Sequence, residues 1–461
     1  MLVILLHATL LPQGSWSDEY FTFGYYRLHG AAEFWRRLLH WAARPASEIV
    51  IWLYWLAVRD TGRPLVAPTL VVAWCIGFLP WLAAVQPWRQ PGRLARCALA
   101  IGLPAGALLG NAVGDLFFWP FGALAYLPAL GLTAGATLLV CGPGLTTWSR
   151  RLAVAVALSV AAGCVEVGAF LAVTAAPLLA LAALRSAEPA SRSQKRLAVA
   201  LTFMPFVVAL VILTTLALGR GMTGTHDMGH AGYTHHLLPS LRAAVPVFFN
   251  DLVRPSGGFL PRSPLAKLLM LLACYACLAA PWPAQPPRAP ILALLGGLLG
   301  TCFLSIATAF FQFGGMCCTR HESYRQICVT LIILCLAALL PRRRLGWLPG
   351  WTGPVLLAVL LLPDLPGRIR DIDAEWRLAP ERAAIRAENF AAARRPGPAP
   401  MPFVLSPAGP LLLGDVLAPG SYALHDKPDF FSLGPMLFFN KDHIIARRPD
   451  VDGGAAAMPK N

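Results

Sequence analysis

The sequence predicts an all-α polytopic membrane protein with about eleven transmembrane helices and a small external α+β domain at its C-terminus. Of the 461 residues, 57% are hydrophobic, which is typical of membrane-embedded chains. Apolar runs of about 20 residues, the length that crosses a bilayer, recur between Leu65 and Leu362. Beyond Pro363 the hydropathy collapses, because residues 364–461 hold 12 of the 23 acidic residues.

The membrane domain is expected to comprise residues 1–364. Residues 13–64 form an expected outer loop with interfacial helices at 33–43 and 47–58, the second too short to cross comfortably. Two half-length helices are expected to meet near Glu166, because basic residues flank the 152–184 segment on both sides. The expected spans are Met1–Leu11, Leu65–Val85, Cys97–Val113, Gly122–Val140, Leu152–Gly163, Val167–Leu184, Leu197–Leu218, Leu265–Trp282, Ile291–Phe311, Ile327–Leu340 and Leu348–Leu362.

Residues 365–461 are expected to form the small external domain. A helical stretch at 374–393 precedes a Pro-rich linker at 394–402, and such linkers interrupt regular structure. Short strand-like pieces follow at 403–405 and 436–439.

The net charge of +15 is explained by membrane topology. Basic residues occupy short connectors such as Arg150-Arg151 and Arg342-Arg343-Arg344, which is the positive-inside pattern of cytoplasmic loops. Nucleic acid is therefore not an expected partner. The pattern, with the Ala-, Arg- and Pro-rich composition, predicts a multi-pass protein of a bacterial inner membrane, with its C-terminal domain in the periplasm.

The acidic pair Asp18-Glu19 is the first candidate for chemistry. Adjacent carboxylates at a membrane edge cost desolvation energy and repel each other. They could supply a general base or ligands for a divalent cation. The structural alternative is a solvated pair that caps a helix beginning at Tyr20.

Further polar candidates fall on the same expected outer side. Asp115 precedes Trp119 and Tyr126, and these aromatic rings suit either a membrane-interface belt or a sugar-stacking surface. Glu166 stands alone between apolar segments. It is either a functional ionisable group or a carboxylate that snorkels to the interface or pairs with an arginine.

A compact basic site is expected at Arg320, His321 and Arg325. Guanidinium groups bind phosphate bidentately, so these residues suit a lipid phosphate, while nonspecific head-group contact is the alternative. His226 and His230 are weak candidate zinc ligands because their spacing fits no metal motif. A polar, flexible outer loop is the preferred interpretation of that region.

Five short elements resemble the GT-C superfamily of membrane glycosyltransferases, especially bacterial members related to protein-mannosyl and aminoarabinose transferases. They are Ser17-Asp-Glu-Tyr20 followed by Arg44-Pro45, the segment Phe118–Tyr126, Glu166 between half-helices, Arg320 in a late loop, and Phe438–Ile444. The short first span and Cys-Cys-Thr before Arg320 depart from the family pattern.

The resemblance implies transfer of a sugar from a polyprenyl-phosphate donor to a hydroxyl of an envelope glycan, lipid or protein, outside the inner membrane. Asp18 would be the base, Glu19 would support it or bind a divalent cation, and Arg320 with Arg325 would hold the leaving phosphate. No other cofactor is implied.

Two other classes of function remain open. A transporter or lipid flippase would use Asp18, Asp115 and Glu166 as a proton or cation relay. A structural subunit of an envelope assembly would leave Glu166 unexplained.

Overall fold

The chain is a multi-pass helical membrane protein. The computed structural model describes residues 1–16, 18–61, 65–90, 92–185, 191–220, 235–253, 264–316, 319–342, 349–395, 399–426 and 428–449. Within these ranges eight helical stretches are long and apolar enough to cross a membrane. They are α5 (Val66–Val85), α6 (Arg93–Gly110), α7 (Pro120–Cys141), α9 (Glu166–Leu184), α10 (Arg192–Arg220), α13 (Arg288–Phe313), α14 (Thr319–Leu339) and the run of α15 (Thr352–Leu361) into α16 (Leu365–Ala393).

Eight of the about eleven expected membrane helices are thus confirmed as long enough to cross, and the other three described helices are shorter. Helices α8 (Trp148–Cys164) and α12 (Pro264–Ala279) lie where spans were expected but have only 17 and 16 residues. The N-terminal helix α1 (Leu2–Ala8) has 7 residues and is therefore about 10 Å long. Turns at residues 9–13 follow the end of this helix.

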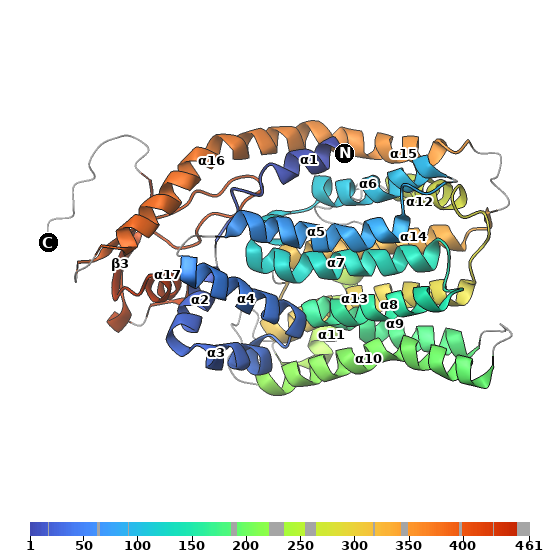
Figure 1. Cartoon of the computed structure of the whole chain (residues 1–461), viewed down its shortest axis with the longest axis horizontal. Helices are drawn as coiled ribbons and strands as arrows, with labels where there is room; N and C mark the ends of the chain where they lie inside the picture. The colour runs from blue at the N-terminus through green and yellow to red at the C-terminus, as the bar shows by residue number, and fades with distance from the viewer. Residues whose placement is uncertain are drawn as a thin grey trace.

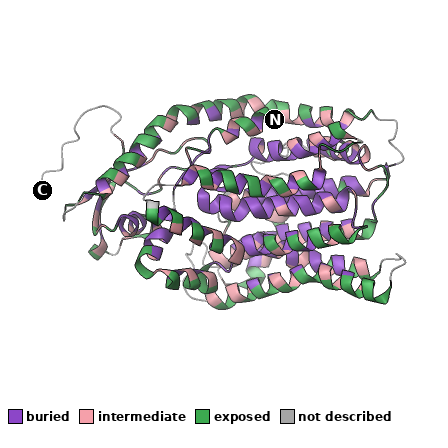
Figure 2. Ribbon diagram, in the orientation of Figure 1, coloured by how far each residue is buried: buried purple, intermediate pink, exposed green. Residues whose placement is uncertain are grey.

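Helix α7 forms the centre of the bundle and is buried along almost its whole length (Figure 2). It lies against α5 (Figure 1), and glycines allow the two backbones to approach. A methyl group added to Gly131 would lie 1.6 Å from the carbonyl oxygen of Gly77. Small residues at such crossings permit van der Waals packing that lipid alone would not drive.

Helices α8 and α9 form a hairpin, as expected from the flanking basic residues. Val165 between them is extended, with φ −157° and ψ 150°, and Glu166 is the first residue of α9. Ser47 Oγ donates a hydrogen bond of 2.8 Å to the carbonyl oxygen of Cys164. This bond ties the start of α4 (Pro45–Thr61) to the end of α8.

The N-terminal segment forms short helices beside the bundle (Figure 1). They are α2 (Asp18–His29), α3 (Ala31–Arg36), a π-helical turn at Arg37–Trp41, and α4. The two expected helices of residues 33–58 are therefore present, and α2 precedes them. A buried pair between Arg37 and Glu48, 3.1 Å apart, ties the π-helical turn to α4.

The C-terminal segment forms a three-stranded sheet with the order β1-β3-β2. Strand β1 (Met401–Val404) is parallel to β3 (His443–Arg447), and β2 (Gly420–Ala423) is antiparallel to β3. Residues 436–439, expected as a strand, belong instead to α17 (Phe430–Phe439). The Asp429 side chain caps this helix by accepting a hydrogen bond from Ser432 N, and Asn440 ends it in a left-handed conformation, which are both helix-terminating signals.

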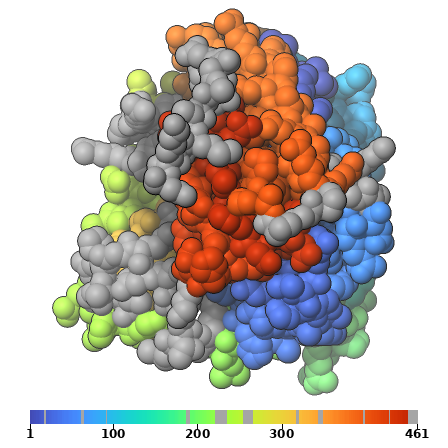
Figure 3. Space-filling view, turned by 90° about the vertical axis from the view of Figure 1, so that its left-hand side faces the viewer, coloured from blue at the N-terminus to red at the C-terminus, as the bar shows by residue number. Residues whose placement is uncertain are grey.

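Helix α17 packs directly on α2. A Cβ at Gly24 would lie 2.4 Å from Leu437 Cβ, and one at Gly434 would lie 3.0 Å from the Phe21 nitrogen. Figure 3 shows the C-terminal residues beside the N-terminal helices on this face of the molecule. We call this part of the molecule, defined by α2, α17 and β1–β3, the sheet end.

Connectors with arginines lie at the opposite end of the bundle (Figure 1). We call it the basic end, defined by residues 86–90, 92–93, 142–151, 185, 191–196 and 280–288. The positive-inside rule would place this end in the cytoplasm, and that orientation stays a prediction.

Cysteine labelling should place the two ends on opposite sides of the membrane. We expect an impermeant maleimide to label Ser421→Cys only from the periplasmic side and Ser149→Cys only after the membrane is opened. The background would replace four cysteines by serine: Cys75 and Cys97, which are not buried, and Cys317 and Cys318, which lie outside the described residues. Labelling of both positions from one side would contradict this topology.

Candidate functional site

Glu19 lies buried between α2 and α7. The indole N–H of Trp119 donates a hydrogen bond of 2.7 Å to its Oε2, and the backbone N–H of Phe121 donates one of 3.3 Å to its Oε1. Phe121 is in the first turn of α7, where backbone N–H groups lack partners and the helix dipole favours a negative charge. Glu19 thus caps α7 from another helix, which offsets the desolvation of its carboxylate.

Trp119 connects this carboxylate to Arg320. The guanidinium carbon of Arg320 lies 5.1 Å from the centroid of the indole ring, within the range of a cation–π contact. Arg320 Nη1 is 3.8 Å from Asp115 Oδ2, an ion-pair distance beyond hydrogen-bonding range. The Arg320 side chain is 27% exposed, so part of the guanidinium faces outward.

A second carboxylate–guanidinium pair lies next to this group. Arg44 donates two hydrogen bonds to Glu166, of 2.8 Å from Nε and 2.9 Å from Nη2. The buried Tyr126 side chain lies near Arg320, Arg44 and Glu166, and the Tyr126 and His321 rings lie 6.0 Å apart. We call Arg320, Asp115, Arg44, Glu166, Tyr126 and His321 the polar cluster. Of the two interpretations of Glu166, pairing with an arginine is the one that the structure shows.

Arg325 has a different environment. It is buried, and its Nε lies 2.9 Å from Asp251 Oδ2. Asp251 is in α11 (Leu237–Val253), a helix within the region expected to be a flexible loop. Because Asp251 already compensates the charge of Arg325, Arg325 is less suited than Arg320 to hold a phosphate.

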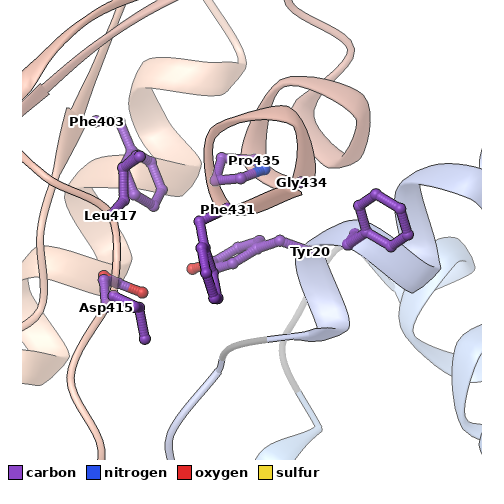
Figure 4. A pocket seen from close by; sticks show the side chains of 9 residues that line it. Tyr20, Phe403, Asp415, Leu417, Phe431, Gly434 and Pro435 are labelled. Atoms are coloured by element: carbon purple, nitrogen blue, oxygen red, sulfur yellow. The ribbon is translucent and has the colours of Figure 1, made fainter. Parts of the chain in front are cut away.

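A small cleft opens beside Tyr20, between α2 and the C-terminal segment (Figure 4). Its volume is about 20 Å³, room for one or two water molecules. Asp415 lines it together with Phe403 and Phe431, and Asp415 Oδ2 accepts a hydrogen bond of 2.7 Å from Ser406 N. Burial raises the pKa of Asp415 to about 7 despite that bond and the nearby Arg386 charge.

Two of the sequence candidates, His226 and His230, lie outside the described part of the chain, in the segment 221–234. Asp18 is the first residue of α2, and only its backbone is described. Among described residues no group of three His, Cys, Asp or Glu side chains could hold a metal ion. Since both Glu19 oxygens accept hydrogen bonds from N–H groups, Glu19 is poorly suited to bind a cation.

Sequence reasoning missed Arg44, Asp251 and Asp415. Arg44-Pro45 was noted only for its resemblance to a motif, and no sequence signal connects it with Glu166 across 122 positions. Asp251 carried a usable signal, because it is an acidic residue that follows the apolar run Val245–Phe249.

Comparisons with models of protein families, with curated proteins and with solved structures found no match for the chain.

Replacing Glu166 by glutamine should destabilise the protein, because Arg44 would keep a largely buried charge without its partner. We expect a loss of about 3 kcal/mol or less, since breaking a fully buried pair costs about 3–5 kcal/mol and this pair is partly exposed. Chemical unfolding in detergent would measure it. The exposed pair Arg59–Asp60 supplies the control, because Asp60→Asn should cost under about 1 kcal/mol. Equal losses of stability in Glu166→Gln and Asp60→Asn would contradict a stabilising role of the Arg44–Glu166 pair.

The raised pKa of Asp415 predicts that its contribution to stability falls as pH rises. The folded state binds the proton of Asp415 more tightly than the unfolded chain does, so the free energy of unfolding decreases between about pH 4 and about pH 7. Above about pH 7 the whole destabilisation by the buried carboxylate remains. Asp415→Asn should therefore raise the melting temperature relative to wild type more at pH 8 than at pH 5. The exposed Asp426→Asn is the control, and an unchanged pH slope in Asp415→Asn would refute the prediction.

Proposed function

We propose that the chain is a GT-C-type glycosyltransferase that moves a sugar from a polyprenyl-phosphate donor to an acceptor hydroxyl at the outer face of a bacterial inner membrane. The observation that carries the proposal is the chain of contacts from Glu19 through Trp119 to Arg320. It holds a partly exposed guanidinium among carboxylates at the sheet end of a membrane bundle. Lipid-linked donors present their phosphate at such a boundary.

Arg320 is the proposed ligand of the donor phosphate. Its guanidinium is oriented by the Trp119 ring. The distance of 3.8 Å to Asp115 is too long for a hydrogen bond, so this carboxylate competes only weakly with a phosphate. Negative charge grows on the phosphate oxygens as the sugar–oxygen bond breaks, and a preoriented cation stabilises that charge. His321 and Tyr126 line the same cluster and are proposed donor contacts.

Asp18 is the proposed general base. The acceptor hydroxyl loses its proton to the Asp18 carboxylate, and its oxygen attacks the anomeric carbon of the sugar. The bond from that carbon to the phosphate oxygen breaks, and the polyprenyl phosphate leaves as an anion, with inversion. Glu19 acts as a positioning residue, because both of its oxygens are engaged in orienting Trp119 and capping α7. No step requires a metal ion.

The acceptor is an envelope glycan, lipid or protein in this proposal. The cleft beside Tyr20, at about 20 Å³, is too small to hold a sugar ring. The acceptor is therefore proposed to reach Asp18 from the sheet end without entering that cleft.

A transporter is the second candidate function, and one observation favours it. Asp251 and Arg325 form a buried ion pair between α11 and α14, and intramembrane ionisable pairs often mark ion pathways. The ion pairs of the polar cluster, Arg320–Asp115 and Arg44–Glu166, involve other residues, so a change at Asp251 removes neither of them. This difference makes them separable by mutation.

The transferase proposal predicts that Asp18→Asn lowers sugar transfer by about 10²–10⁴-fold, the usual contribution of a general base. Arg320→Gln should lower it by about 10²–10³-fold through lost charge stabilisation. Trp119→Phe should have a smaller effect, because it keeps a ring for Arg320 but loses the hydrogen bond to Glu19. Transfer from labelled polyprenyl-phosphate sugars to envelope acceptors would be measured with purified protein.

The control is Asp60→Asn, whose carboxylate is 70% exposed in the same outer segment and should leave transfer unchanged. No transfer by the wild type from any donor, together with ion flux in liposomes that Asp251→Asn abolishes, would favour the transporter instead.

A further inference from the structure

A groove at the basic end is a separate candidate binding site, far along the bundle from the Arg320 cluster. It lies between the end of α9 and the first half of α10 and has a volume of about 410 Å³. Seven residues line it: Leu184, Arg192, Lys195, Arg196, Val199, Ala200 and Phe203. None of these lining residues is acidic.

The lining changes from cationic to apolar along one face of α10. Arg192, Lys195, Arg196, Val199 and Phe203 follow helical spacing, which places them on one side of the helix. The cations occupy the first turns and the apolar side chains of Val199 and Phe203 follow, so that the lined stretch extends about 17 Å along the helix from Arg192 to Phe203. Leu184 and Phe203 are 54% and 38% exposed, so the apolar part is open to an occupant.

The positive-inside rule explains why cations gather at this end. It does not explain why they line one groove together with exposed apolar side chains. A phosphate attracts the three cations, and an acyl chain attached to that phosphate would cover the apolar side chains. Basic pockets between membrane helices on this side commonly bind anionic lipid head groups.

We propose that the groove binds one anionic glycerophospholipid of the leaflet at the basic end. Arg192, Lys195 and Arg196 hold its phosphate, and Leu184, Val199 and Phe203 hold an acyl chain. The proposal does not depend on the transferase activity, since none of these residues belongs to the Arg320 cluster. It makes the protein a lipid-binding protein at the face opposite its proposed active site.

The test measures lipid retention by the full-length protein in detergent, using native mass spectrometry. Phosphatidylglycerol and phosphatidylcholine with the same acyl chains would be added in parallel. We expect at least about tenfold preferential retention of phosphatidylglycerol, because cations near a membrane surface attract anionic lipids. The variant R192Q/K195Q/R196Q should lose this preference.

The matched control is R89Q/R93Q/R288Q, which removes the same charge from the basic end outside the groove and should keep the preference. Phe203→Ala should weaken retention of long-chain phosphatidylglycerol while leaving the melting temperature unchanged. An equal loss of the phosphatidylglycerol preference in both triple variants would overturn the proposal, because it would indicate nonspecific attraction to the basic surface. Competition by millimolar inorganic phosphate as effective as that by phosphatidylglycerol would overturn it in favour of a simple anion site.

Discussion

The sheet end of the molecule depends on one buried carboxylate at the start of one helix. Glu19 receives hydrogen bonds from Trp119 and from the first turn of α7. A carboxylate without such donors would be expensive at this depth, so the position of α2 is coupled to that of α7. Because α7 is the central helix of the bundle, α2 is attached directly to the most buried part of the protein.

This attachment organises two further regions. On one side, the indole that binds Glu19 also supports the guanidinium of Arg320 at the start of α14. On the other side, α2 carries α17 through close contacts at Gly24 and Gly434. The sheet and the polar cluster therefore share one support, and a displacement of α2 would disturb both. This sharing gives the C-terminal segment a route to influence the proposed active site without supplying a catalytic group.

Much of the architecture was predictable because membranes impose simple rules on composition. The apolar runs from Leu65 onward lie on helices, and the break before Glu166 was required by the basic residues on both sides. The failures have local causes. The Phe-rich segment at 436–439 looks like a strand by composition, but Asp429 and Asn440 define the two ends of a helix. Likewise, an apolar run at the N-terminus gave a helix of only 7 residues.

The sequence by itself determined the class of the protein, the positions of its membrane helices and the chemical types of the candidate groups. Those properties follow from local composition and from the cost of placing charge in a bilayer. Only the tertiary structure decided the partners, such as Arg44 for Glu166, Asp251 for Arg325 and Trp119 for both Glu19 and Arg320. These pairings join distant parts of the chain, because each of these side chains is met by a partner that helix packing brings to it.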